Sequence, residues 1–531
     1  MKSDIATHAN NGAAHDFDGQ VQQVAKIILS NRADKYFQEN VPNAGLGRAS
    51  LHSGIIVVAA RGVGLMSQVV SIIILARLLT PHDFGLAAII FSLTSFGPML
   101  IDLGTSESSS QKTSISRAEV STLFWINLMM GVLLACILIA LSGPLATFYR
   151  EPELTSIAIF TSITFIASGL TIQHSALLRR AMQFRSLAAI DICANVISSV
   201  LSIAMALTGW GYWALLTKTV CAICVTAIGV WFSCRWLPMR PHYSPEVKKS
   251  LRFGMGVTGF LVTDNLAKSA DRIALGYFYG ASALGYYQNA LLFYGNVLGL
   301  LADPLHPIAV SSLSKLRNSL NEFRQSWTTA LSTLSFVTAL IFALLAVAGT
   351  DFIVILLGER WAPAGTILCI FAVRGIAQTF ERTLGWLHVS SGRSERWMKW
   401  GLFSSVCQIA AVLAGLPFGV IGTAITGTII VYLLFIPGLA YAGRPVGITT
   451  TDVVKAVAPQ IVAGLAAIAL GLLARHFVFH DFNEIVRLVL TGSLCAAVYF
   501  LIAVVLFRVT KPLTLALSVI SDYTMRLSRN S

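Results

Sequence analysis

The sequence has few charged residues. Only 12% of its 531 residues are Asp, Glu, Lys or Arg, and 55% are hydrophobic, whereas soluble globular domains carry about 25% charged residues. Such a chain cannot cover itself with polar surface. Apolar stretches recur from residue 53 to residue 507, and each is long enough to cross a hydrocarbon layer of about 30 Å. The composition predicts an all-α polytopic membrane protein with about 14 transmembrane helices.

The N-terminus lacks the pattern of a cleavable signal peptide, because no apolar core follows a basic end. We therefore expect the first membrane span to act as its own signal. Residues 1–50 form a polar cytoplasmic tail in which Val21, Val24 and Ile28 recur at helical spacing. An interfacial helix and a disordered tail both remain open for this segment.

Several sequence signatures of enzymes are missing. The chain has no G-x-x-x-x-G-K-[ST] loop, no H-E-x-x-H helix and no G-x-S-x-G turn. Its 8 cysteines all lie in apolar runs, and Cys221 and Cys224 lack a second pair and polar surroundings, so we expect them to pack rather than bind metal. The predicted external loops are too short to hold a sugar acceptor and a catalytic acid. We predict no enzyme, no catalytic residue, no metal and no cofactor.

The net charge of +13 could indicate nucleic acid, but its distribution favours membrane orientation. The basic loops at 177–185, 235–252 and 391–399 fall on one side if the N-terminus is cytoplasmic. The arginines on the other side are Arg150, Arg360, Arg475 and Arg487. This asymmetry follows the positive-inside rule. It predicts that both termini are cytoplasmic, and the charge then implies no nucleic-acid partner.

The decapeptide ARLLTPHDFG, residues 76–85, interrupts two apolar runs. Pro81 cannot continue a helix, Asp83 can cap a helix N-terminus, and Gly85 relieves crowding as the next helix starts. We therefore predict a tight external hairpin.

When the sequence is compared with itself at an offset of 200 residues, this hairpin aligns with GYFYGASALG, residues 276–285, and Gly85 aligns with Gly285. Both segments lie between two apolar spans, and six spans separate the first members of the two pairs. The pattern predicts two six-helix lobes related by a parallel pseudo-twofold axis, followed by two C-terminal helices. The expected ranges are 1–50 for the N-terminal tail, 51–240 for the N-lobe, 241–442 for the C-lobe, 443–507 for the last two spans and 508–531 for a cytoplasmic C-terminal tail.

Ionisable residues inside these spans are candidates for function, because a charge at the bilayer centre costs about 2.5–3.5 kcal/mol on insertion scales. The span near 253–277 has the densest set: Asp264, Lys268, Asp271 and Arg272. The spacing of four places Asp264, Lys268 and Arg272 on one face. Two alternatives stay open, namely permanent ion pairs that hold the helix in its lobe, or a cationic cavity wall in which a protonating carboxylate releases Lys268 to an anionic ligand.

The span near 363–389 repeats this pattern with Arg374, Gln378 and Glu381, while Arg382 is placed to snorkel to the cytoplasmic side. Arg374 lies too far from either end to snorkel easily, so we expect it to line a cavity. In the first span Arg61 can either snorkel or line the cavity.

Polar residues in other spans complete the candidate set. Lys218 is placed to pair with Asp191 of the preceding span, and intramembrane amides more often join helices than bind substrate. The candidate cavity cations are Arg61, Lys268, Arg272 and Arg374. The candidate coupling or ion-pair residues are Asp264, Asp271, Asp191, Lys218 and Glu381. The candidate polar lining residues are Gln68, Asn195, Gln378, Asn289 and Asn296.

Four stretches carry a resemblance to a known family: ILARLLTPHDFGLAAIIF (74–91), IDLGTSESSSQ (101–111), GWGYWAL (209–215) and DRIALGYFYGASALGYYQNA (271–290). The chain resembles the Wzx-type polysaccharide transporters of the multidrug/oligosaccharidyl-lipid/polysaccharide exporter superfamily, and within them the colanic-acid exporter-like (WzxC-like) branch. The resemblance covers most of residues 48–440.

This resemblance implies two helical lobes around a central cavity. It also implies a flippase that moves a polyprenyl-pyrophosphate-linked oligosaccharide across the bacterial inner membrane for exopolysaccharide or lipopolysaccharide biosynthesis. The partners it implies are the lipid-linked oligosaccharide, membrane lipid and a polysaccharide polymerase or export machinery. Because cavity residues vary among members, it transfers no family-wide catalytic set.

Two other functions are alternatives. One is a cation-coupled multidrug antiporter of the same superfamily, and the other is a membrane glycosyltransferase, polymerase or ligase. The intramembrane arginines suit an anion and favour the flippase. Without a nucleotide site, the energy for alternating access would come from an ion gradient or from consumption of the product outside.

Overall fold

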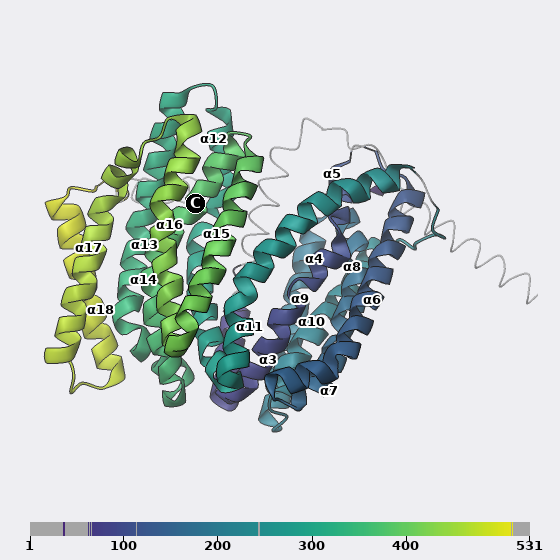
Figure 1. Cartoon of the computed structure of the whole chain (residues 1–531), viewed down its shortest axis with the longest axis horizontal. Helices are drawn as coiled ribbons and strands as arrows, with labels where there is room; N and C mark the ends of the chain where they lie inside the picture. The colour runs from purple at the N-terminus through teal and green to yellow at the C-terminus, as the bar shows by residue number, and fades with distance from the viewer. Residues whose placement is uncertain are drawn as a thin grey trace, which may run out of the picture. The chain divides into compact units, whose positions relative to one another are not determined.

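The computed structural model describes Tyr36, Phe37, Gly62, Gly64, residues 66–112, 114–242 and 245–510, Pro512 and Thr514. Every regular element in these ranges is helical (Figure 1). Nearly all of the predicted N-terminal tail, Arg61 and most of the predicted C-terminal tail lie outside the described residues, so those predictions are not tested.

The helices divide between two compact units. The first unit holds the described residues up to Leu75 and the described residues of Thr94–Val262. The second unit holds Ala76–Leu93 and the described residues from Thr263 onward. The first unit contains α4 (Gly97–Asp102), α5 (Thr105–Gln111), α6 (Arg117–Tyr149), α7 (Glu153–Thr161), α8 (Ile163–Arg180), α9 (Phe184–Leu207) and α10 (Trp213–Cys234). The second contains nearly all of α3 (Pro81–Thr94), together with α12 (Leu305–Lys315), α13 (Leu320–Leu357), α14 (Ala362–Ser390), α15 (Ser394–Gly415), α16 (Gly419–Gly443), α17 (Thr450–Phe477) and α18 (Glu484–Phe500). The long α11 (Pro245–Ala302) begins in the first unit and ends in the second.

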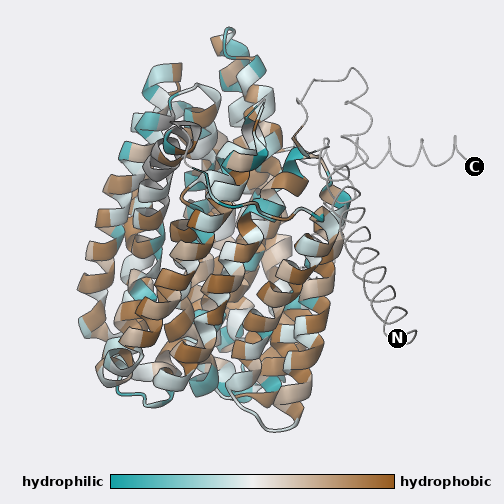
Figure 2. Ribbon diagram, turned by 90° about the vertical axis from the view of Figure 1, so that its right-hand side faces the viewer, coloured by the Kyte–Doolittle hydropathy of each residue, from teal (hydrophilic) through white to brown (hydrophobic). Residues whose placement is uncertain are grey.

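The described residues include 11 helical stretches long and apolar enough to cross a membrane. Two of them, Asn265–Lys315 and Glu395–Val446, have 51 and 52 residues and are interrupted by a non-helical Gly280 and by the short 3₁₀ turn Leu416–Phe418. Each can therefore hold two crossings, and the shorter helix Met66–Leu78 lies in the first predicted span. The chain is thus a multi-span helical membrane protein, and the prediction of fourteen spans is consistent with this pattern. Figure 2 shows hydrophobic residues along the helices and hydrophilic ones mainly near their ends.

The predicted hairpin begins α3 as its residue types suggest. The Asp83 carboxylate accepts hydrogen bonds from the Thr80 backbone N–H at 2.8 Å and from the Thr80 hydroxyl at 2.6 Å, and the Asp83 N–H donates back to that hydroxyl oxygen at 3.2 Å. These reciprocal bonds satisfy backbone donors that the first turn leaves unpaired. Pro81 takes the first helical position, where its missing N–H costs nothing.

Gly85 and Gly285 allow two backbones to touch. A Cβ atom on Gly85 would lie 1.8 Å from the carbonyl oxygen of Ala281, and one on Gly285 would lie 1.9 Å from the carbonyl oxygen of Pro81. The contact is reciprocal under the offset of 200. Gly85 meets Ala281, which is the counterpart of Pro81, and Pro81 meets Gly285, which is the counterpart of Gly85. Two elements related by a twofold axis form contacts of this kind. The offset seen in the sequence therefore has a counterpart in space.

A buried carboxylate joins the last two helices to α13. Asp351 is 1% exposed, and its Oδ1 accepts hydrogen bonds from Arg475 of α17 at 3.0 Å and from Arg487 of α18 at 2.6 Å. Toward the other end of these helices, the Tyr499 hydroxyl donates to the Phe336 carbonyl at 2.8 Å within an apolar cluster. This packing and the ion triad hold α17 and α18 against the second unit.

Candidate substrate-binding site

Arg374 lies near the middle of α14. It is about 18 Å from Ala362 and about 24 Å from Ser390 at 1.5 Å per residue. Its side chain is half-buried, and its Nε donates to Gln378 Oε1 at 2.9 Å. Among the side chains that the structure describes, no Asp or Glu lies within ion-pair distance of Arg374. An intramembrane cation without an acidic partner is a candidate for ligand binding.

Two buried tyrosines from the second half of α11 face this arginine. The Tyr294 hydroxyl donates to Gln378 Oε1 at 2.6 Å, so the Gln378 oxygen accepts from both Tyr294 and Arg374. Arg374 is also close enough to Tyr287 and Tyr294 for its charge to act on both hydroxyl groups. These contacts orient the guanidinium and leave its Nη donors for a further acceptor.

Tyr287 connects the arginine to the first half of α11. Its hydroxyl donates to Asp271 Oδ2 at 2.7 Å, and Asp271 Oδ1 lies 3.8 Å from the Nε of Arg272. Arg272 also donates through Nη2 to the Ser269 hydroxyl at 2.9 Å and to the Lys268 carbonyl at 3.1 Å. Its Nε is buried and has no hydrogen-bond partner among the described residues. Arg272, Arg374 and Asp271 together carry a net positive charge, which suits an anion.

The structure thus brings four of the predicted residues into one network, namely Asp271, Arg272, Arg374 and Gln378. These four residues and the two tyrosines, Tyr287 and Tyr294, are called the Arg374 network below. Lys268 contributes its backbone carbonyl, and its side chain is exposed. The side chain of Asp264 lies outside the described residues, so the predicted competition for Lys268 is untested.

Other predicted residues of the second unit lie beside this network. Arg382, expected to snorkel, is exposed and forms an ion pair with Asp303. Glu381 is half-buried, and its charge acts on Tyr294. Asn289 is fully buried and donates to the Gly285 carbonyl at 3.2 Å, while Asn296 is half-buried. Asn289 therefore binds its own helix backbone near the Gly285 contact.

The candidates in the first unit form separate contacts. The predicted ion pair between Lys218 and Asp191 is not formed, because Lys218 donates to the Ser71 hydroxyl at 2.7 Å and the Asp191 side chain is exposed. Asn195 donates to the backbone carbonyl of Asp191 at 2.9 Å. Gln68 is half-buried on Met66–Leu78.

Sequence reasoning missed Tyr287 and Tyr294. A signal was available, because their spacing of seven places them on one helix face in the segment YYQNALLFY. For metal binding, the described residues contain no group of three or more His, Cys, Asp or Glu side chains placed to hold an ion.

A family model described as "Polysaccharide biosynthesis protein" matches residues 74–365, more than half of the chain. The chain belongs to this polysaccharide biosynthesis protein family. It is 26% identical over 452 residues to the teichuronic acid biosynthesis protein TuaB of Bacillus subtilis (strain 168), covering 81% of this chain and 90% of the relative. It is 24% identical over 440 residues to the succinoglycan biosynthesis transport protein ExoT of Rhizobium meliloti (strain 1021), covering 81% and 87%.

The resemblance to Wzx-type transporters is confirmed by another relative. The lipopolysaccharide biosynthesis protein WzxC of Escherichia coli (strain K12) is 24% identical over 373 residues, covering 68% of this chain and 73% of that protein.

Solved structures show the fold. The lipid II flippase MurJ in an inward closed conformation matches with a TM-score of 0.66 and 16% identity, over 86% of this chain and 99% of that one. A multidrug resistance transporter of the MATE family matches with a TM-score of 0.55 and 14% identity, over 74% and 98%. At these identities the likeness concerns the fold alone, and it confirms the predicted all-α polytopic membrane fold.

Proposed function

We propose that this protein flips a polyprenyl-pyrophosphate-linked oligosaccharide across the bacterial inner membrane for exopolysaccharide or lipopolysaccharide biosynthesis. The observation that carries the proposal is the family membership, with relatives named for polysaccharide biosynthesis and transport that align over most of their length. The chain acts as a transporter and not as an enzyme, and it hands its product to the polymerase or export machinery outside.

The Arg374 network supplies the chemistry that such a substrate needs. A pyrophosphate cannot enter hydrocarbon without compensating charge. Arginine presents a planar fork of donors that matches phosphate oxygens, and charge-assisted hydrogen bonds are stronger where water is excluded. Arg374 and Arg272 hold the pyrophosphate in a cavity, while Gln378 and Tyr294 fix the orientation of Arg374. The polyprenyl tail stays in lipid as the two lobes, 51–240 and 241–442, open alternately.

We propose that both termini lie in the cytoplasm, because the basic loops would then lie on the cytoplasmic side. In this orientation the hairpin after Leu79 is external, and the substrate is loaded from the cytoplasmic side, where the basic loops lie.

Complementation tests the proposal directly. The chain is expressed in a strain whose own polysaccharide flippase has been deleted, and surface polysaccharide and cytoplasm-facing lipid-linked oligosaccharide are measured. Wild type restores export. Arg374→Ala lowers it at least tenfold, because a charged hydrogen bond is worth about 1.5–3 kcal/mol. The control Arg185→Ala, which changes an exposed arginine in the first turn of α9, exports normally.

One pattern of results overturns the proposal. If the wild-type chain reaches the membrane in normal amount and restores no export in any tested glycan background, yet lowers the accumulation of cationic dyes in a drug-sensitive strain, the protein is a drug antiporter.

A further inference from the structure

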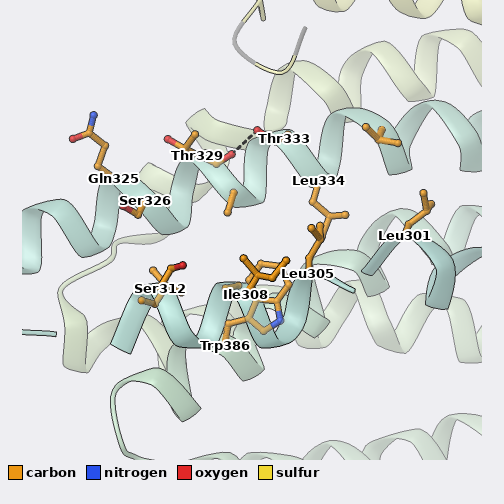
Figure 3. Close-up of a pocket in the computed structure, with 14 residues that line it drawn as sticks. Leu301, Leu305, Ile308, Ser312, Gln325, Ser326, Thr329, Thr333, Leu334 and Trp386 are labelled. Atoms are coloured by element: carbon orange, nitrogen blue, oxygen red, sulfur yellow. Dashed lines mark hydrogen bonds between the residues drawn. The ribbon is translucent and has the colours of Figure 1, made fainter. Parts of the chain in front are cut away.

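A cavity lies in the same unit, separate from the Arg374 network. It has a volume of about 660 Å³, is open on one side, and is lined by the end of α11, by α12, by the first half of α13 and by Trp386 near the end of α14 (Figure 3). This volume is in the range of small-molecule sites. None of the predicted site residues lines it.

The two ends of this cavity differ in polarity. Ser312, Gln325 and Ser326 line one end, and Leu301 and Leu334 lie toward the other (Figure 3). The side chains of the three polar residues make no hydrogen bond to any other residue in the described ranges, so their donors and acceptors are available to a ligand. The cavity thus suits an amphiphile with one polar end and one apolar end.

Basic residues follow the polar end. Lys315 lies three residues after Ser312 on α12, which places both on one side of that helix. Arg317 comes next, and its Nη1 lies 3.2 Å from where a Cβ on Gly392 would be. Both side chains are exposed, and neither forms an ion pair with an acid that the structure describes. This charge favours an anionic head group.

The depth of the cavity matches a lipid of the cytoplasmic leaflet. α13 starts at Leu320 on the proposed cytoplasmic side, and the lining residues run from Gln325 to Val337, which spans about 18 Å along the helix. The polar end therefore lies at head-group level, and the apolar end points toward the bilayer centre. A membrane lipid has the same order of head group and chain.

Two of the helices that line the cavity, α11 and α14, also carry the Arg374 network. Leu301 lies about 10 Å beyond Tyr294 on α11, and Trp386 lies about 18 Å beyond Arg374 on α14. A lipid held here would have its head group on the cytoplasmic side of the arginine that receives it. An ordinary phospholipid has no reason to be placed on this route, whereas the substrate does.

We propose that this cavity captures the substrate from the cytoplasmic leaflet, with the polyprenyl chain along Leu301 and Leu334 and the phosphate at the end formed by Ser312, Gln325 and Ser326. The head group then moves to Arg374. This inference rests on the proposed function and adds a loading site to it.

Photolabelling of the full-length protein in lipid nanodiscs tests the site. The probe is a polyprenyl pyrophosphate with a diazirine on its prenyl chain, and the labelled peptides are identified by mass spectrometry. Labelling is expected within residues 301–313 and 325–337, and unlabelled polyprenyl pyrophosphate displaces the probe at least tenfold better than phosphatidylglycerol. Equal displacement by both overturns the proposal in favour of an ordinary phospholipid site, and labelling confined to other helices also overturns it.

Two adjacent serines give a matched pair of variants. Ser311 and Ser312 are both exposed on α12, but only Ser312 lines the cavity. Ser312→Trp fills the polar end and should lower labelling about tenfold, a change of about 1.4 kcal/mol, and slow export. Ser311→Trp should keep labelling within about twofold of wild type. Equal labelling of the two variants overturns the site.

A third variant and the wild type distinguish a misfolded variant, a wrong loading site and a wrong proposed function from one another. Ala330→Trp blocks the cavity from α13 and should also lower labelling, so the test survives if Ser312→Trp does not fold. Wild-type protein that restores export but shows no label in the cavity overturns the loading site and leaves the proposed function intact. Labelling in the cavity without any export supports lipid capture and counts against the proposed function.

Discussion

The arginines of this protein differ in how their charge is compensated. Arg475 and Arg487 share the buried carboxylate of Asp351, whereas Arg374 contacts the neutral oxygen of Gln378. A buried charge with a carboxylate partner serves to join helices, and removing one partner is costly. A half-buried charge held only by an amide remains able to attract an anion. The presence of a carboxylate partner, and not the burial of the side chain alone, distinguishes structural arginines from binding ones.

The largest expected effect is on the compensated arginines. Asp351→Asn leaves Arg475 and Arg487 without their carboxylate, and we expect the free energy of unfolding to fall by about 3 kcal/mol, the lower end of the range for a broken buried pair, since both arginines are partly exposed. Thermal unfolding in detergent measures the loss. Glu359→Gln, an exposed carboxylate near the same end of α13, is the control and should unfold as wild type does. An unchanged stability for Asp351→Asn would contradict the role of the triad.

Arg374→Leu should have the opposite effect on stability. Arg374 has no acidic partner among the side chains that the structure describes, and removing such a charge relieves a desolvation cost. We therefore expect the unfolding free energy to stay the same or to rise by about 1 kcal/mol while export is lost. The same thermal assay, run beside Asp351→Asn, checks the sign. A loss as large as that of Asp351→Asn would make Arg374 a structural residue.

A smaller effect is expected at Tyr294. Tyr294→Phe removes one of the two hydrogen bonds on Gln378, worth about 1 kcal/mol, so Arg374 is held less firmly and export should fall about fivefold. Tyr432→Phe provides the matched control, because its hydroxyl donates to the Val373 backbone carbonyl one residue from Arg374. If both variants export equally, the Tyr294 hydroxyl has no role in orienting the arginine.

The smallest effect is expected for a pair in water. Glu395 and Lys399 form an exposed ion pair at 2.7 Å on α15, and such pairs contribute little because water screens them. Glu395→Gln should leave the melting temperature and export unchanged within error. A clear loss in either measurement would show that compensation matters even at exposed positions.

Periodicity predicted the part of the site that lies on a single helix. Arg374 and Gln378 were found because a spacing of four places side chains on one face, and the residues of the hairpin at Pro81 identified a helix start. Helix type and approximate bounds follow from the same apolar pattern, since hydrocarbon leaves the backbone few alternatives.

Contacts between helices were harder to predict. Tyr287 and Tyr294 belong to the site because of where α11 packs. Their spacing of seven indicates that they share a helix face, but it does not say which helix that face meets. Asp351 was assigned no role from the sequence, and Arg475 and Arg487 were assigned to external loops, so their meeting could not be foreseen. Lys218 was paired with the wrong residue because adjacency in sequence does not fix which side chains face each other.

The reciprocal contact of Gly85 with Ala281 and of Gly285 with Pro81 has a mechanical consequence. Helices that interlock through side chains must unlock before they can rotate, because close-packed side chains resist small displacements. At this point backbone rests directly on backbone, with small residues on either side. This backbone contact therefore gives the two helices a pivot about which their angle can change. A larger residue at Gly85 or Gly285 would push the two backbones apart and remove this pivot.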